Sequence, residues 1–320
     1  MKILFTADVH IKLGQKNVPV DWARNRFNLF IEQFAEMQNQ ADLVIIGGDV
    51  FDRLPTMDEV ELYFDFVESF KKPTLIYPGN HEMLKKDTTF LTYLKKSTQR
   101  LNPLVSMIDE YYENLDFGVD IIPYNKLKDF EKYGCSLKNR ILCTHVRGEI
   151  APHVKPEVDL EIFKRWDIVL AGDLHSYENS QLNILYPGSP YTTSFHRNPV
   201  DTGAILLDGD TLAHVWLKFQ LPQLIKKTIT ADEAVAAIGT AFDHTIYEVE
   251  GDMQELGELA DSELIATKVL KRDTDSALML DPEMSLDAEV KEYLTYILEL
   301  PEITVDKVLQ EMQNHAEKFT

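Results

Sequence analysis

Five mostly apolar runs along this chain each end in a short polar motif, and this repeated pattern most constrains the fold. Each run is short and bounded by turn residues, which is typical of a buried strand in a parallel sheet. We therefore predict an α/β fold. Because ligands bind beyond the carboxyl ends of the strands in such sheets, polar residues distant in the sequence should cluster there. The runs are residues 3–5, 43–46, 74–77, 141–143 and 168–171.

The five motifs consist of carboxylate, amide and imidazole groups, the donors that hard to borderline divalent metals prefer. Two such ions, about 3.5–4 Å apart, can activate a nucleophile and hold the charge that develops as a phosphodiester is hydrolysed. One motif alone would be weak, but all five in order predict a two-metal phosphoesterase. The motifs are Asp8-Val9-His10, Gly47-Gly48-Asp49, Gly79-Asn80-His81-Glu82, Thr144-His145 and Gly172-Asp173-Leu174-His175.

The spacing of these residues suggests separate roles for the candidate ligands. Asp49 follows two glycines, where a carboxylate can sit close to both metals and bridge them. Asp8 and His10 are two residues apart, so both can bind metal only if the strand has ended and the chain turns between them. Asn80 offers a neutral carbonyl oxygen.

His81 is the candidate proton donor. It adjoins Asn80 and can point the other way, toward the leaving oxygen of a phosphodiester. A neighbouring carboxylate, Asp52 or Glu82, could keep the imidazole protonated.

Composition limits the possible settings of the protein. With 44% hydrophobic residues, the 320-residue chain can bury a core, and no apolar run is long enough to span a membrane. The N-terminus leads straight into the first motif, and the cysteines Cys135 and Cys143 form no disulfide framework, so we expect a cytoplasmic protein.

The negative charge is concentrated in the last third of the chain. Residues 221–320 contain 22 acidic and 8 basic side chains, which is two thirds of the formal net charge of −21. Phosphate contacts dominate affinity for DNA, so such a chain should bind DNA poorly alone. This favours a basic partner or a contact made chiefly through metal.

Two segments are candidate interfaces. Thr56 and Glu59 form a capping-box pattern at the start of a helix over 56–70. Its apolar surface is too wide for one buried stripe, so it either packs between a sheet and a neighbouring element or meets a second copy, in which case charge at Tyr63 or Phe66 would give monomers. Beyond a small α/β unit at 230–275 and a linker at 276–284, two amphipathic helices flank Pro301 and either fold back or dock on another protein.

The motif set resembles the metallophosphoesterase superfamily. Within it, the segment Tyr186-Pro187-Gly188-Ser189-Pro190 followed by Thr193-Ser194-Phe195 is similar to the SbcD-type nuclease subunit of double-strand-break repair complexes, in a version like those of large tailed bacteriophages. The resemblance implies a four-layer α/β/β/α sandwich with a small α/β capping domain and a C-terminal helix pair. The implied domains are a nuclease domain at 1–222, a capping and DNA-binding domain at 223–275, and a linker with an ATPase-binding segment at 276–320.

The same resemblance implies an activity and its partners. We expect a manganese-dependent DNA exonuclease and endonuclease, for which Mg²⁺ could also serve, acting on double-stranded DNA ends. It would work with an SbcC-type ATPase bound through residues 285–319, in recombination, repair or replication. A homodimer through the helix at 56–70 is also expected.

The family pattern assigns the ligands and the catalytic residues, and one position departs from it. His81 falls on the catalytic histidine, and Asp52 replaces a second histidine of some cellular relatives. The family usually has histidine where this chain has Asp173, so the second metal would have one more carboxylate and one fewer imidazole as ligands. The resemblance assigns one metal to Asp8, His10, Asp49 and His175, and the other to Asp49, Asn80, His145 and Asp173.

Two other functions remain open. The segments 48–53 and 79–82 also resemble motifs of phosphoserine phosphatases, but no glycine follows His10, and Val146 and Arg147 rather than glycines follow His145. Alternatively, the altered ligand at Asp173 could mark a catalytically weak scaffold subunit. Activity on a phosphomonoester against duplex DNA, and the metal content, would separate these functions.

Overall fold

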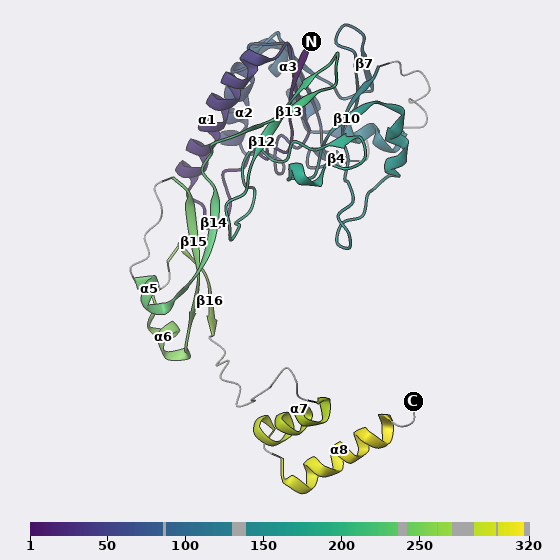
Figure 1. Ribbon diagram of the computed structural model, residues 1–320. Helices are drawn as coiled ribbons and strands as arrows, with labels where there is room; N and C mark the ends of the chain where they lie inside the picture. The colour runs from purple at the N-terminus through teal and green to yellow at the C-terminus, as the bar shows by residue number, and fades with distance from the viewer. Residues whose placement is uncertain are drawn as a thin grey trace. The chain divides into compact units, whose positions relative to one another are not determined.

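The computed structural model describes residues 1–85, 88–129, 139–235, 242–260, 262–270, 285–298 and 300–316 (Figure 1). The chain divides into two compact units. The first comprises Met1–Val249 and Leu259–Thr267, and the second comprises Glu250–Glu258 and Lys268–Thr320. The predicted boundaries after residues 222 and 275 stay a prediction, and the predicted linker at 276–284 lies outside the described residues.

The first sheet has six strands in the order β13-β12-β1-β2-β3-β6. Three of the predicted strands, β1, β2 and β3, are parallel neighbours in it, and β6 extends the parallel part. The hairpin of β12 and β13 adds two antiparallel strands beside β1. The bounds are β1 Lys2–Thr6, β2 Leu43–Gly47, β3 Thr74–Tyr77, β6 Val105–Met107, β12 Gly203–Asp208 and β13 His214–Lys218.

The second sheet has five strands in the order β11-β10-β9-β8-β7 and contains the other two predicted strands, β9 and β10. These two are parallel, and β8 and β11 are parallel to them, whereas β7 is antiparallel to β8. All five strands that the apolar runs predict are therefore confirmed. The bounds are β7 Tyr112–Asn114, β8 Val119–Ile122, β9 Ile141–His145, β10 Ile168–Gly172 and β11 Ile184–Leu185.

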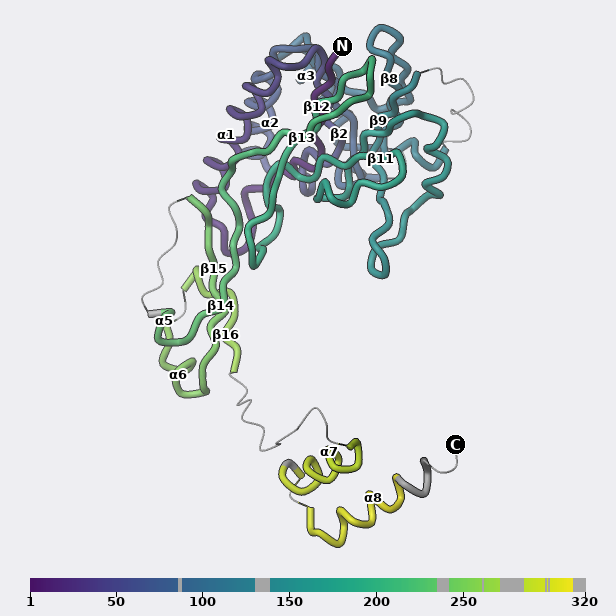
Figure 2. Tube along the Cα trace, in the orientation of Figure 1, coloured from purple at the N-terminus to yellow at the C-terminus, as the bar shows by residue number. Residues whose placement is uncertain are grey.

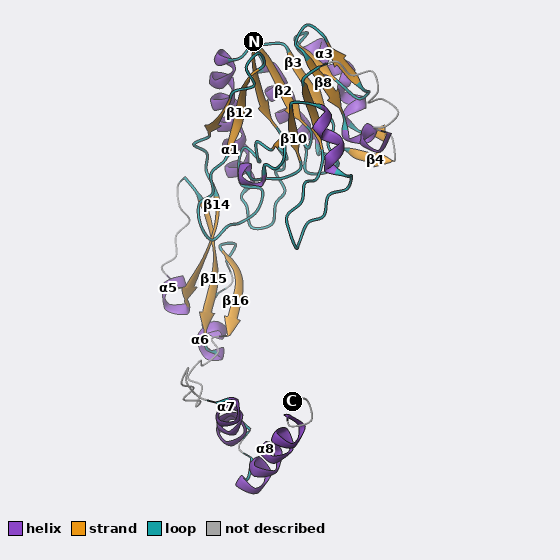
Figure 3. Cartoon of the chain, turned by 45° about the vertical axis from the view of Figure 1, so that its right-hand side comes forward, coloured by secondary structure: helices purple, strands orange, loops and turns teal. Residues whose placement is uncertain are grey.

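Alternate strand residues pack into different layers, which makes the fold the predicted α/β/β/α sandwich (Figure 3). In β1, Leu4 joins the core beneath the helices, while Ile3 and Phe5 join the core between the two sheets. The outer face of the second sheet packs against Phe163 of the 3₁₀ helix η4 (Leu160–Arg165). Strands buried on both faces are apolar throughout, which explains the runs in the sequence. The helices over the first sheet are α1 (Val20–Met37), α2 (Met57–Glu68) and α3 (Leu91–Leu101).

Helix α2 begins as predicted but uses most of its apolar surface in the core. The capping box of Thr56 and Glu59 is present in both directions. Tyr63 and Phe66 are fully buried against the sheet and the neighbouring helices. These two side chains therefore cannot form a dimer interface, and the prediction that charge at Tyr63 or Phe66 would give monomers is wrong, because the charge would disrupt the core first.

The chain beyond β13 forms further strands and helices, from β14 to α8 (Figure 2). A three-stranded sheet has the order β14-β15-β16. Smaller elements are the hairpin of β4 and β5 and the 3₁₀ helices η1, η2 and η5. None of the helices in the described part of the chain is long and apolar enough to cross a membrane. The bounds are β4 Met83–Lys85, β5 Thr88–Thr89, β14 Leu224–Thr230, β15 His244–Gly251, β16 Ile265–Leu270, α5 Ala231–Val235, α6 Met253–Glu258, α7 Leu286–Glu292, η6 Tyr293–Ile297, α8 Glu302–Ala316, η1 Gln38–Gln40, η2 Tyr124–Asp129 and η5 Tyr177–Asn179.

Candidate metal centre

The polar motifs meet because the chain turns sharply where the strands end. The backbone is left-handed at Asp8 (φ 55°), His10 (φ 47°), Asp49 (φ 49°) and Asp173 (φ 104°). The turn expected between Asp8 and His10 is thus present. Such conformations are costly for residues other than glycine, and they persist where the surrounding structure holds them, often at functional sites.

Two glycines allow the motifs to approach one another closely. A Cβ atom added at Gly48 would lie 2.6 Å from Nδ1 of His145, and the backbone there has φ +88°. One added at Gly79 would lie 2.2 Å from Oδ1 of Asp49. The side chains of the second and fourth motifs therefore need glycine at these positions.

Asp8, His10 and His175 form the first group of candidate ligands, with one ligand atom of each within 4.8 Å of the others. The Nε2 atoms of His10 and His175 face each other at 3.1 Å. Within the part of the chain that the structure describes, Nδ1 of His10 is buried without a hydrogen-bond partner. Two imidazoles and a carboxylate arranged in this way fit a divalent cation.

The second group is centred on His145. Its Nδ1 lies 2.9 Å from the carbonyl oxygen of Gly47, so Nδ1–H donates there and Nε2 is the ring nitrogen that faces the other candidate ligands. Three oxygens surround Nε2, namely Oδ1 of Asn80 at 2.9 Å, Oδ2 of Asp49 at 3.5 Å and Oδ1 of Asp173 at 3.9 Å. The structure thus brings together the second predicted ligand set.

Asp49 lies between the two groups. Its Oδ2 is 3.8 Å from Nε2 of His10, 3.5 Å from Nε2 of His145 and 3.9 Å from Nε2 of His81. Its Oδ1 accepts the backbone N–H of His81 at 2.9 Å, which fixes the orientation of the carboxylate. One carboxylate is therefore within reach of ligand atoms from both groups.

The electrostatics of the side chains favour positive charge near His145. Burial would lower its pKa, but the carboxylates of Asp49 and Asp8 raise the pKa to about 10. For Asp49, burial acts to raise the pKa, but the neighbouring imidazoles lower it below its usual range. Burial lowers the pKa of His10 to about 3. A buried carboxylate that stays ionised needs positive charge beside it, which a metal ion can supply.

His81 lies at the mouth of the site, with 38% of its side chain exposed. Its Nδ1 is 2.6 Å from the backbone carbonyl of Asp52, so Nδ1–H donates and Nε2 faces Asp49. The Asp52 carboxylate instead pairs with Lys12 at 2.8 Å. Asp52 therefore contacts the imidazole through its backbone and not through its carboxylate.

Glu82 points away from the imidazole, although its position in the sequence made it a candidate partner of His81. Its buried carboxylate accepts the backbone N–H groups of Asp49, Phe51 and Gly79 at 2.8–3.0 Å. Burial raises its pKa to about 7. Glu82 thus ties together the loops of the second and third motifs.

Sequence reasoning named the segment after Tyr186 only for its family resemblance and did not foresee its contacts. The Ser189 hydroxyl donates to the carbonyl of Asp8 at 2.8 Å, and the Tyr191 hydroxyl donates to the carbonyl of Val9. The Thr193 hydroxyl lies 3.2 Å from Nδ1 of His175. The segment therefore holds the left-handed first motif and one imidazole in place.

A family model matches the first two thirds of the chain, and a phage protein resembles it over its whole length. The model of the calcineurin-like phosphoesterase family matches residues 1–225. The "Probable exonuclease subunit 1" of Escherichia phage T5 is 37% identical over 330 residues and covers all of both chains. The "Putative phosphoesterase 244L" of Invertebrate iridescent virus 6 is 25% identical over 223 residues, which are 64% of this chain and 75% of that protein.

A solved structure, that of a novel archaeal phosphodiesterase, also matches. It covers 68% of this chain and 100% of its own, with 14% sequence identity and a TM-score of 0.40.

The family match over residues 1–225 and the full-length viral relative, together with the site geometry, lead to one conclusion. The chain belongs to the calcineurin-like phosphoesterase family and is a phosphoester hydrolase.

Proposed function

We propose that this chain is a two-metal DNA nuclease of the SbcD type, with Mn²⁺ as the preferred ion and Mg²⁺ as an alternative. The observation that carries the two-metal proposal is the position of Asp49, whose Oδ2 is 3.8 Å from His10 and 3.5 Å from His145. One such oxygen between two groups of donors suits a ligand shared by two cations.

The donors divide into two sets that share Asp49. When bound, two divalent cations supply Lewis acidity and activate a water molecule for attack on a phosphodiester. The chain's own residues hold the ions and fix the geometry before substrate arrives. We assign Asp8, His10, Asp49 and His175 to one ion, and Asp49, Asn80, His145 and Asp173 to the other.

His81 is proposed as the general acid. The carbonyl of Asp52 holds Nδ1–H, so the proton available for transfer is on Nε2, at the exposed mouth of the site. Donation from Nε2 to the leaving oxygen would avoid a free alkoxide. Asp52 supports this role by orienting the ring, and its carboxylate is free to hold Lys12.

Two observations favour DNA over a phosphoprotein as substrate. The phage T5 relative, similar over its full length, is named a probable exonuclease subunit. The segment from Ser189 to Thr193, which resembles the SbcD type, is part of the site because it bonds the first motif and His175. Action in recombination, repair or replication follows from this proposal.

The direct test compares substrates. End-labelled duplex DNA should be shortened by the chain with Mn²⁺, and faster when an SbcC-type ATPase is added, while a small phosphomonoester should be hydrolysed slowly. Rapid phosphomonoester hydrolysis with intact DNA would favour the phosphatase. Stoichiometric metal with neither activity would favour the scaffold subunit.

The helix pair of the second unit is proposed as the ATPase-binding segment, residues 285–319, with the preceding domains at 1–222 and 223–275. Leu286, Tyr293 and Ile303 are exposed by 67%, 46% and 73%. Exposed apolar side chains on short helices suit a partner surface. Deleting residues 285–320 should leave the nuclease folded and abolish co-purification with the ATPase, and retained co-purification would overturn the assignment.

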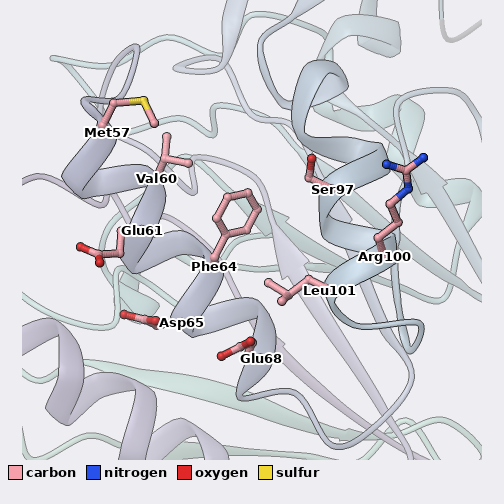
Figure 4. Close-up of a pocket in the computed structure, with 9 residues that line it drawn as sticks. All are labelled: Met57, Val60, Glu61, Phe64, Asp65, Glu68, Ser97, Arg100 and Leu101. Atoms are coloured by element: carbon pink, nitrogen blue, oxygen red, sulfur yellow. The ribbon is translucent and has the colours of Figure 1, made fainter.

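A homodimer is proposed through the outer faces of α2 and α3. A groove of about 680 Å³ is lined by both helices, with Phe64 and Leu101 between them (Figure 4). Its charged lining residues are Glu61, Asp65 and Glu68 of α2 and Arg100 of α3. In a two-fold dimer the same patch meets itself, so Arg100 of one copy could pair with the acidic residues of the other. Met57 is 80% exposed and Phe64 half-buried, so Met57→Glu with Phe64→Glu should give monomers in sedimentation. A wild-type monomer at micromolar concentration would contradict the dimer.

A further inference from the structure

Asp173, the position that departs from the family pattern, is paired with an arginine. Nε of Arg147 lies 3.1 Å from Oδ2 of Asp173, and Nη2 lies 3.2 Å from Oδ1. Two parallel N–H···O bonds of this kind fix the plane of the guanidinium group as well as its position. The Asp173 side chain is 6% exposed and the Arg147 side chain is 45% exposed. The pair therefore joins the buried site to its surface.

The backbone of Arg147 also makes a hydrogen bond that fixes its position. Arg147 comes two residues after His145, the last residue of β9. Its backbone N–H donates to Oε1 of Glu157 at 3.2 Å, and Oε2 of Glu157 accepts the Tyr124 hydroxyl at 2.9 Å. Arg147 is thus held beside the second set of donors by three hydrogen bonds, two from its guanidinium group and one from its backbone N–H.

The charges explain why an arginine and an aspartate occur together here. A carboxylate in place of an imidazole adds one negative charge to a site that already contains Asp8 and Asp49. The guanidinium group of Arg147 offsets that charge, so the pair is neutral, as an imidazole would be. Arg147 also has five N–H donors, of which Asp173 takes two. The remaining edge of the fork suits a second anion with two oxygens.

We propose that Arg147 binds a non-bridging phosphate oxygen of the substrate beside the second set of donors, and that Asp173 orients it. This rests on the proposed function, since it concerns the same site. Asp173 would thus hold the guanidinium group of Arg147 beside the scissile phosphate or the adjacent phosphate of the strand. The substrate class is a phosphodiester, and the arginine recognises its phosphate without reading base sequence.

A second arginine–aspartate pair, at the opposite ends of β9 and β10, provides a matched control. Arg140 and Asp167 form a similar ion pair, with Nε and Oδ2 2.5 Å apart, just before β9 and β10 begin. This pair lies at the amino ends of the strands, whereas Arg147 and Asp173 lie at the carboxyl ends. Arg140→Ala therefore breaks an exposed arginine–aspartate ion pair that is not part of the candidate metal centre.

The first experiment measures DNA binding by the full chain with Mn²⁺. A His81→Ala background keeps a fluorescent duplex intact, and anisotropy is followed over a range of salt concentrations. Arg147→Ala should weaken binding by about 10-fold or more. The slope of log affinity against log salt should fall by about 1, because one phosphate contact is lost. Arg147→Lys should recover part of the affinity, and Arg140→Ala should change neither value. Where the wild-type background binds the duplex, unchanged affinity and slope in Arg147→Ala would overturn the proposal.

A second experiment separates this inference from the proposed function. With bis(4-nitrophenyl) phosphate as substrate, Arg147→Ala should raise KM more than it lowers kcat, while calorimetry still shows two bound Mn²⁺ ions. If wild-type protein binds no DNA but this KM effect is present, the DNA nuclease proposal fails and the role of Arg147 stands. An unchanged KM, or loss of one Mn²⁺ ion with no other effect, would assign Arg147 to holding the metal ligand alone and overturn substrate binding.

Discussion

The two halves of the site, which share Asp49, are built by different means. Asp8, His10 and His175 form the first half, and hydroxyl groups of the 189–193 segment hold it by bonding backbone carbonyls and one imidazole. In the second half, an arginine holds Asp173, one of its acidic donors, through an ion pair. The first half thus depends on backbone geometry and the second on charge. Substitutions should therefore affect metal affinity in the first half and charge-dependent binding in the second.

Loss of the shared carboxylate should have the largest effect, because it breaks both halves. Asp49→Ala should lower kcat by more than the roughly 10²–10³-fold cost of one lost electrostatic contact. Calorimetry should show both Mn²⁺ sites weakened, since the two cations lose the anion between them. Asp167→Ala, distant from the site, serves as the control. One Mn²⁺ site bound as in the wild type would show that Asp49 does not bridge.

Removing the proposed general acid should leave Mn²⁺ binding in both halves of the site unchanged. His81→Ala should lower kcat by about 10²–10⁴-fold, the usual contribution of general acid–base catalysis. Mn²⁺ stoichiometry and DNA binding should stay close to wild type, because His81 is proposed to donate a proton and not to bind a metal ion. His153→Ala, an exposed histidine outside the motifs, is the matched control. A missing Mn²⁺ ion in His81→Ala would make His81 a ligand instead.

Removing one hydrogen bond that holds the first half of the site should have a smaller effect, limited to one of the two Mn²⁺ ions. Tyr191→Phe leaves the buried carbonyl of Val9 without its hydroxyl donor, at a cost of about 1–3 kcal/mol in unfolding free energy. The affinity for one Mn²⁺ ion should fall by about 10–100-fold, as when a hydrogen bond that orients a metal ligand is lost.

The other ion should bind as before in Tyr191→Phe. Thermal unfolding and a two-site calorimetric fit would measure both quantities. Equal weakening of both ions would mean that the two halves are not supported separately.

Much of the fold and of the donor set follows from the sequence, because local patterns report burial and turns. The apolar runs indicated β1, β2, β3, β9 and β10, and the polar residues after them meet in one place. The sequence could not show the direction of a side chain. Glu82 was a plausible partner for an imidazole, yet it accepts three backbone N–H groups instead.

Long-range contacts were also beyond the sequence. Arg147 and Asp173 are 26 residues apart and pair because β9 and β10 are neighbours. Ser189 reaches Asp8 across 181 residues. Likewise, the wide apolar surface of α2 is explained by the fully buried Tyr63 and Phe66, which only the packed structure reveals.

The central claim is that two cations share Asp49, one in each half of the site. Electron paramagnetic resonance of the chain titrated with Mn²⁺ tests it most directly. Two ions held about 3.5–4 Å apart should be spin-coupled. We expect the second equivalent of Mn²⁺ to produce a coupled two-ion signal, which should be absent in Asp49→Ala. Saturation at one ion per chain, or two ions with uncoupled spectra, would contradict it.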